Sequence, residues 1–371
     1  MHRNTLFQRW FLPGFVFQSL IIGGGYATGR ELVEFFLGSG PLAGLVGLLV
    51  VTVTFSISAA IGFELARLTR TYDYRTFLKQ LIGPGWIVYE ILLATLVLLV
   101  LAVLGAASGE LVSANLGWPP AVGTVTMMTL IGILVFRGSA LIEKALAGWS
   151  FLLYAVYAVM IFAYLSDYGY RLGDVFAADD MTGDWQISAL KFVGYQVTAI
   201  PMILFCIRHL ETRKDAIIAG IMTGPIGMIP AILFYLGMVA SYPEILDVPV
   251  PADYIMQQLD FGWISILFYI VVFGTFIETG TAMIHGINER INHVFLEHSE
   301  HMPRWLRPVV AISLILVSVI LATYFGVIDL IAQGYGSMGW AFLVVIFVPL
   351  MTVGVWRVLN GRQAPPPAAR Q

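Results

Sequence analysis

Charged residues are scarce in this sequence, because Asp, Glu, Lys and Arg together make up only 12% of its 371 residues. A soluble domain carries about 25%, so the chain has too few ionic groups to cover the surface of a water-soluble body. A second cysteine is also missing: Cys206 stands alone, which excludes a disulfide framework and a cysteine metal cage. The formal net charge is −3 without a basic cluster, so nucleic acid is not an expected partner.

Apolar residues, by contrast, make up 58% of the chain and form long runs that end at glycine, proline or clustered charges. A membrane-spanning helix needs about 20 largely apolar residues, and the first run is too long for a signal-peptide core. The sequence therefore predicts an all-α polytopic membrane protein, with the lipid bilayer as a partner. We expect ten spans, at 10–37, 41–66, 86–113, 119–137, 141–166, 188–208, 213–241, 261–288, 305–323 and 326–357.

The Lys and Arg residues indicate how these spans are oriented. With ten spans, 17 of the 20 cations fall on the side of the two termini, and only Arg30, Arg171 and Lys191 fall on the other. Cations concentrate in cytoplasmic loops, so we expect both termini in the cytoplasm and the protein in the cell (inner) membrane. The spans form one domain over 10–358, followed by a proline-rich tail at 361–371 that we expect to be disordered.

Ten spans also divide into two halves of five, 10–166 and 188–358. Because five is odd, the two halves would have opposite orientations in the membrane. This is the arrangement of an inverted-topology repeat, on which many secondary transporters are built. The repeat is inferred from parity and from the two interrupted helices described next.

The first span contains three consecutive glycines, Gly23, Gly24 and Gly25, and a fourth at Gly29. Each costs a helix about 1 kcal/mol relative to alanine, and adjacent glycines point all round a helix rather than along one packing face. We therefore expect an unwound segment, which is tolerated in a membrane only where it lines a protein or water cavity.

The sixth span, which opens the second half, contains Pro201 after Gly194 and Thr198. Proline removes a backbone donor and clashes with the preceding turn, so this span is expected to be interrupted as well. Interruptions at corresponding positions of the two halves point to the central site of a transporter.

The Gly-Gly-Gly-Tyr-Ala-Thr-Gly-Arg-Glu stretch at 23–31, in a chain of ten spans, resembles the YkvI-type amino-acid permease family. That family belongs to the LeuT-fold, amino acid–polyamine–organocation group, and the resemblance covers Trp10 to Leu359. It implies a five-plus-five inverted repeat, alternating access, and a solute site between the broken first and sixth helices and the third and eighth. It does not imply a particular substrate, because one fold serves many functions.

The two interruptions supply the candidate substrate-binding groups. We expect the inner half of the first span to end near 21–23 and the outer half to begin near Thr28, where free N–H groups favour a carboxylate. Carbonyls of the sixth span, with the Tyr195 hydroxyl or the Gln196 amide, would receive an ammonium, although these two side chains could instead serve interhelical hydrogen bonding. The candidates are Gly23, Gly24, Gly25, Tyr26, Thr28, Gly29, Tyr195, Gln196 and Thr198.

The resemblance also implies a sodium site. In LeuT-fold sodium symporters, hydroxyls of the eighth helix complete a sodium shell with carbonyls of the first, which assigns Thr279 and Thr281 together with Ile22 and Gly25. Each threonine could alternatively bond to its own helix. A second sodium is not expected, because Ala27 stands where the sodium/neurotransmitter branch has asparagine.

Glu278 falls near the middle of the eighth span, where a bare charge costs at least about 2.5–3.5 kcal/mol. It is the candidate for proton coupling, for a cation ligand or for the counter-charge of a substrate ammonium. A structural carboxyl bonded to a neighbouring helix is the alternative.

Arg30 lies just beyond the glycine run, and Asp329, early in the tenth span, is expected at a similar depth. The LeuT-fold resemblance suggests that they form a thin extracellular gate over the solute. A local pair of Arg30 with Glu34, four residues later, is the alternative.

These features together predict a secondary transporter for a small amino acid or related zwitterion, coupled to sodium, with proton coupling through Glu278 as the alternative. The expected partners are a small-molecule solute and the coupling ion, Na⁺ or H⁺, without a cofactor; the oligomeric state does not follow from the chain. A channel or receptor is the competing class. An enzyme is not expected, because no catalytic motif occurs.

Overall fold

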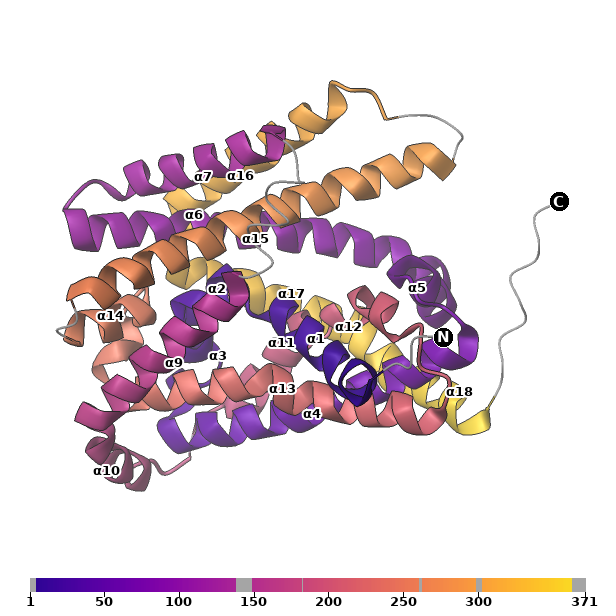
Figure 1. The fold of residues 1–371 in the computed structure, drawn as a ribbon, viewed down its shortest axis with the longest axis horizontal. Helices are drawn as coiled ribbons and strands as arrows, with labels where there is room; N and C mark the ends of the chain where they lie inside the picture. Colours follow the sequence, from indigo (N-terminus) through magenta and orange to yellow (C-terminus); the bar gives the residue numbers. More distant parts are fainter. Residues whose placement is uncertain (1–4, 138–148, 182, 260–261, 298–301, 362–371) are drawn as a thin grey trace.

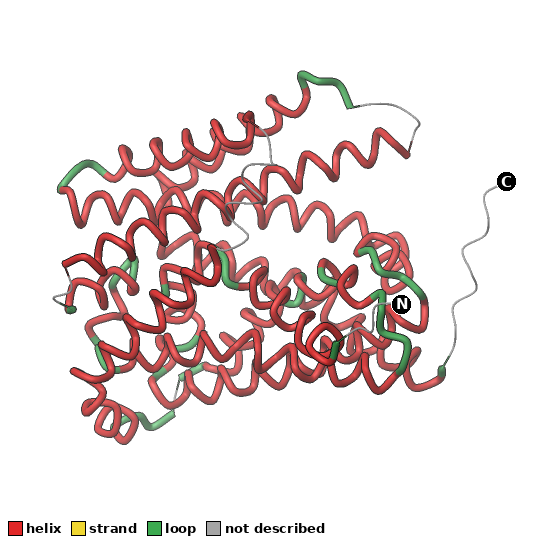
Figure 2. The backbone as a smooth tube through the Cα atoms, viewed as in Figure 1, coloured by secondary structure: helices red, strands yellow, loops and turns green. Residues whose placement is uncertain are grey.

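The computed structural model describes residues 5–137, 149–181, 183–259, 262–297 and 302–361. Within these ranges the chain forms helices, turns and loops and no strand (Figure 2). The beginning of the fifth predicted span and residues 362–371 of the predicted disordered tail lie outside the described residues.

The helices of the first half follow the predicted spans closely. Gly40 (φ 111°) and Pro41 begin α4, and Gly117 (φ 67°) ends α6, so local backbone preferences set these boundaries. The helices are α1 (Leu12–Ile21), α2 (Gly24–Thr28), α3 (Arg30–Phe35), α4 (Pro41–Thr69), α6 (Trp86–Leu116), α7 (Pro120–Arg137) and α9 (Trp149–Tyr168).

The second half contains α11 (Trp185–Gln196), α12 (Ala199–Met202), α13 (Arg213–Val239), α15 (Gly262–Glu297), α16 (Leu306–Asp329), α17 (Gly336–Phe342) and α18 (Val355–Asn360). Between Leu306 and Asn360 the chain is helical almost throughout, with π-helical turns in its second part. Gly326, at φ 67° and ψ 175°, kinks this stretch at the predicted start of the tenth span. In the described chain, six helical segments are long and apolar enough to cross a membrane. The other spans are interrupted, shorter or joined.

Short helices occupy the hydrophilic connections. The loop after α4 contains α5 (Tyr74–Ile82), whose first turn is capped by Asp73, which accepts a hydrogen bond from the Thr76 amide at 2.8 Å. The two longer connections carry α10 (Leu172–Ala177) and α14 (Pro251–Gln258). Figure 1 places α5, α18 and the N-terminus at one end of the molecule, and α10 and α14 at the opposite end.

The long helices form two groups, seen along the upper and lower sides of Figure 1. The first group packs α6, α7, α15 and α16 together, and the second packs α4 against α13, with α1 and α11 beside them. Small residues bring α4 and α13 close: a Cβ at Gly220 would lie 2.3 Å from Ala60 Cα. Of the interrupted helices, α1 and α11 thus belong to the second group, while α2 contacts α6 and α15 of the first group.

Candidate functional site

The first span is broken where the glycines predict a break. Helix α1 ends at Ile21, Gly23 is extended (φ −93°, ψ −169°), and α2 starts at Gly24. The second segment of this span therefore begins earlier than the expected start near Thr28. Thr28 is instead buried in the last turn of α2, where its hydroxyl donates to the Gly25 carbonyl at 2.6 Å.

The second interruption is milder than the first. The Val197 amide still donates to the Val193 carbonyl at 2.8 Å, but the Ile200 amide then donates to the Val197 carbonyl, three residues back, at 3.1 Å. Pro201 has no amide hydrogen to donate to Val197, which accounts for the tighter turn here. The Thr198 hydroxyl donates to the Tyr195 carbonyl at 2.7 Å.

A cavity of about 220 Å³ lies against both interruptions. Its walls come mainly from the first and sixth spans and from α6 and α15, the four helices that the resemblance implied, and Tyr335 of the last span adds to them. Most of the lining is apolar, and it extends along α15 as far as Arg290. The polar side chains that line it are Glu31, Tyr195, Gln196, Thr198, Thr279, Arg290 and Tyr335.

Glu31 is a cavity residue that the sequence analysis did not single out. It is only 4% exposed, and the Tyr195 hydroxyl donates to its Oε2. Its Oε1 lies directly over Gly25, where an added Cβ would be 2.1 Å from it. The Gln196 amide in turn donates to the Tyr195 hydroxyl oxygen at 3.3 Å. The available signal was an acidic residue inside an apolar span, two positions after Gly29.

The remaining candidates of the first span lie elsewhere. Tyr26 lines a second cavity, of about 170 Å³, together with Ala27, Tyr154 and Tyr157. The Tyr157 hydroxyl donates to the Ala27 carbonyl, while the Tyr26 hydroxyl is buried without a hydrogen-bond partner among the described residues. Gly29 has a structural role, because its φ of 80° is one that side-chain-bearing residues rarely adopt.

The structure separates the predicted ligands on the eighth span. Thr279 lines the cavity, and its Cγ2 lies 3.8 Å from the position of a Cβ at Gly23. Thr281 is two residues further along the same helix and therefore points away from that side. Its hydroxyl is buried without a hydrogen-bond partner in the described part of the chain. Glu278 is half-buried and is not part of the cavity lining.

Arg30 makes the local pair rather than the longer-range gate contact. Its Nη2 lies 3.0 Å from Glu34 Oε2. Its Nη1 donates to the Leu246 carbonyl and, at 3.3 Å, to the Val248 carbonyl. Asp329 accepts a hydrogen bond from Gln333 at 3.4 Å. In this conformation Arg30 thus links α3, the last segment of the first span, to the connection before α14.

A second set of bonds fastens α14 to the other helix group. Asp253 accepts hydrogen bonds from Tyr269 at 2.7 Å, from Gln257 at 2.9 Å and from Asn115 at 3.3 Å. Asp253 lies outside the membrane-spanning segments, and burial raises the pKa of its carboxyl. The connection containing α14 therefore bridges α3, α6 and α15 at this end of the molecule.

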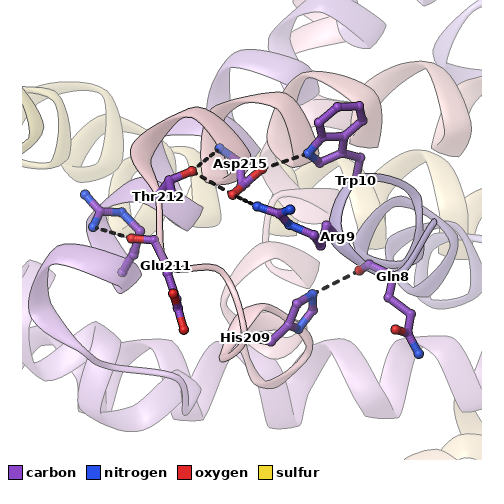
Figure 3. Close-up of polar contacts among 8 residues, drawn as sticks. Gln8, Arg9, Trp10, His209, Glu211, Thr212 and Asp215 are labelled. Atoms are coloured by element: carbon purple, nitrogen blue, oxygen red, sulfur yellow. Dashed lines mark hydrogen bonds and ion pairs between the residues drawn. The ribbon is translucent and has the colours of Figure 1, made fainter. Parts of the chain in front are cut away.

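At the opposite end, the segment before α1 is bound to the start of α13 (Figure 3). Asp215 accepts hydrogen bonds from the Arg9 guanidinium, from Trp10 Nε1 at 3.0 Å and from the Thr212 hydroxyl at 2.6 Å. The His209 ring shares a further hydrogen bond with the Gln8 carbonyl at 3.0 Å. We call these bonds of Arg9, Trp10 and Gln8 to Asp215 and His209 the N-terminal clamp. Because α13 packs on α4, the clamp holds the segment before α1 in the group of α4 and α13.

The end of the cavity nearest the N-terminus is marked by Arg290. Its guanidinium lies 2.9 Å from Glu90 Oε2 and 4.4 Å from the centre of the Tyr74 ring. Both partners belong to the segment of α5 and α6, so Arg290 is fixed to the wall of the cavity rather than placed across it.

Comparison with solved structures identifies the fold. A variant of the Eremococcus coleocola manganese transporter is similar over 97% of this chain and 85% of its own, with a TM-score of 0.53 and 14% identity. The inward-facing conformation of Mhp1 is similar over 91% of this chain and 72% of its own, with a TM-score of 0.51 and 15% identity. The protein is a multi-pass membrane protein with the LeuT fold, whose first and sixth helices are interrupted.

Sequence comparison points to particular relatives. The chain is 20% identical to the uncharacterized membrane protein YkvI of Bacillus subtilis over 344 residues, which is 90% of this chain and 92% of that protein. It is 21% identical to YyaD of the same organism over 334 residues, 89% of this chain and 93% of YyaD. No protein-family model matches. The similarity to YkvI-type membrane proteins confirms the resemblance drawn from the glycine motif.

Proposed function

We propose that the protein is a secondary transporter that carries a small amino acid or related zwitterion by alternating access. The observation that carries this proposal is the cavity of about 220 Å³ at the two helix interruptions, with few polar groups in an apolar wall. Sites of small solutes are concave and mostly apolar, with a few placed polar groups. LeuT-fold similarity supports transport as the use of such a cavity.

The conformation supports the same proposal. At the end of the molecule that contains α14, the contacts of Arg30 and Asp253 close the space next to Glu31. In the other direction the cavity extends to Arg290, at the end that holds the N-terminus. We assign this as an inward-facing state, with both termini in the cytoplasm and the protein in the cell membrane. In the outward-facing state the two helix groups would tilt so that the Arg30 contacts part.

Sodium is the proposed coupling ion. Thr279 lies beside Gly23 at the break, where α1 ends with carbonyls that no longer have helical partners. Hard oxygen ligands of this kind suit a small cation without requiring a full charge. The Thr279 hydroxyl and the Ile22 and Gly25 carbonyls form the proposed set. The Gly25 carbonyl already accepts the Thr28 hydroxyl, so it would bind the ion through its second lone pair. Thr281 would join the set only if α15 rotated. Proton coupling through Glu278 is the competing assignment.

Uptake into proteoliposomes tests the coupling. An imposed sodium gradient should drive accumulation of solute at equal pH, whereas a pH gradient alone should not. Thr279→Val should raise the sodium concentration for half-maximal uptake by about tenfold, because a polar contact to a charged group is lost. Thr275→Val is the matched control, because the Thr275 hydroxyl donates to the Val271 carbonyl of its own helix at 2.8 Å.

The opposite results are equally informative. Accumulation that follows pH and is lost in Glu278→Gln would refute sodium coupling and favour the proton. Solute counterflow in the absence of any gradient distinguishes a carrier from a channel or receptor, so its absence would refute transport by alternating access.

A further inference from the structure

Glu31 places a carboxyl in the cavity without a cation beside it. It is 4% exposed, and among the ion pairs of the described residues none includes it. A buried carboxylate is costly unless a positive charge or several hydrogen bonds compensate it. Tyr195 supplies one such bond, to Oε2. The other oxygen, Oε1, faces Gly25 and the cavity.

The cations nearest in sequence and in the cavity are already engaged. Arg30 turns its guanidinium to Glu34 and to the carbonyls of Leu246 and Val248. Arg290 is held by Glu90 and by the Tyr74 ring at the far end of the cavity. The compensating charge for Glu31 is therefore missing from these side chains, and a ligand in the cavity is placed to supply it.

The surroundings of the carboxyl favour an organic ammonium over a metal ion. Tyr195 and Tyr335 both line the cavity, with ring centres 5.2 Å apart, and aromatic faces attract alkylammonium groups. A divalent metal needs several charged or hard ligands. The described residues contain no group of three His, Cys, Asp or Glu side chains that could hold one.

We propose that the Glu31 carboxylate, flanked by Tyr195 and Tyr335, binds the positively charged amino group of the solute. This inference rests on the proposed function, and it names the chemical class of the solute: a small molecule that carries an amine. It also gives the Gly25 position a purpose, since only glycine leaves room for the carboxyl above the broken helix.

Ligand-induced thermal stabilisation of the purified full-length protein tests this subsite, because a ligand of the native state raises its melting temperature. The probes are the standard amino acids, ethanolamine and putrescine. Lactate, ethylene glycol and 1,4-butanediol, in which hydroxyl replaces amine, are the matched analogues of alanine, ethanolamine and putrescine. At least one amine should stabilise the protein, and its hydroxyl analogue should not.

Substitutions then assign the binding group. Glu31→Gln keeps the shape and the acceptor for Tyr195 but should weaken amine binding by about 100-fold, because a buried charge pair is lost. Glu110→Gln, the same change on α6 outside the cavity lining, should leave the affinity unaltered. Tyr195→Phe should weaken binding by about tenfold, whereas Tyr164→Phe, whose hydroxyl bonds Ser241 away from the cavity, should not.

The outcomes separate the subsite from transport. Amine binding that depends on Glu31, but without counterflow in proteoliposomes, supports the subsite and refutes the transporter. The subsite is overturned if Glu31→Gln binds and exchanges the amine as the wild type does, or if hydroxyl analogues bind equally well. It is also overturned if no amine binds, or if Glu31→Gln loses only the binding of Na⁺ or Mn²⁺.

Discussion

A methyl group added at Gly25 tests whether the Glu31 carboxyl is held where the structure places it. The Cβ of alanine at this position would lie 2.1 Å from Glu31 Oε1 and 3.0 Å from its Cδ. Both separations are well inside van der Waals contact, so the carboxyl has to move and give up its hydrogen bond from Tyr195. Gly23 is the matched control, because a Cβ there meets only Thr279 Cγ2, at 3.8 Å.

The expected cost follows from three contributions. Overpacking a filled site costs about 1–3 kcal/mol, and leaving a buried polar group without its partner costs about 1–3 kcal/mol more. Alanine favours the helical conformation of α2 by about 1 kcal/mol relative to glycine, which offsets part of this loss. Gly25→Ala should therefore lower the free energy of unfolding by about 3 kcal/mol. Gly23→Ala, at a position with an ordinary φ of −93°, should change it by less than about 1 kcal/mol.

Equilibrium unfolding in mixed detergent micelles measures these free energies, and a double-mutant cycle identifies the contact responsible. Glu31→Ala removes the carboxyl, so the methyl group at position 25 then has room. The loss caused by Gly25→Ala should mostly disappear in that background, giving a clear coupling energy. The reasoning is refuted if Gly25→Ala is as stable as Gly23→Ala, or if the two substitutions are additive.

Two further predictions concern the ends of the molecule. Asp215→Ala removes the acceptor of Arg9 and Trp10 and should destabilise the protein by about 2 kcal/mol; if its unfolding curve matches the wild type, the clamp contributes nothing. Burial raises the pKa of Asp253, so the folded state keeps this proton to higher pH than the unfolded state. The stability that this group contributes is present at low pH and is lost as pH rises from the ordinary aspartate value of about 3.9 through the raised pKa. Melting curves over this range should show a steeper decline for wild type than for Asp253→Asn, and equal slopes would contradict the assignment.

Much of the fold was predictable because it depends on local physics. The apolar runs had to be helical in a bilayer, where each backbone group needs an internal partner. The glycines at 23–25 and Pro201 weaken a helix wherever they occur, so both interruptions lie within a few residues of their predicted positions. The break near Gly326 between the last two spans follows the same rule.

The site was less predictable, because it depends on which side of each helix faces the cavity. Neighbouring residues on a helix point about 100° apart, so Thr279 reaches the cavity and Glu278 does not. The predicted span boundaries were accurate to a few residues. Turning a helix about its axis by the angle between two neighbouring residues, about 100°, is nevertheless enough to exchange these roles. Glu278 was proposed because of its depth in the eighth span, and the sequence does not show which side of that helix it occupies.

The amino-acid sequence by itself determines that the chain crosses a membrane several times. It also determines where the first and sixth helices break, because hydrophobicity and backbone freedom act within each segment. Only the tertiary structure decided which carboxyl lies in the cavity. Tyr195 follows Glu31 by 164 positions, and the space for the carboxyl exists only because Gly25 turns its bare backbone toward it. Such contacts arise when separate helices pack, and no single segment encodes them.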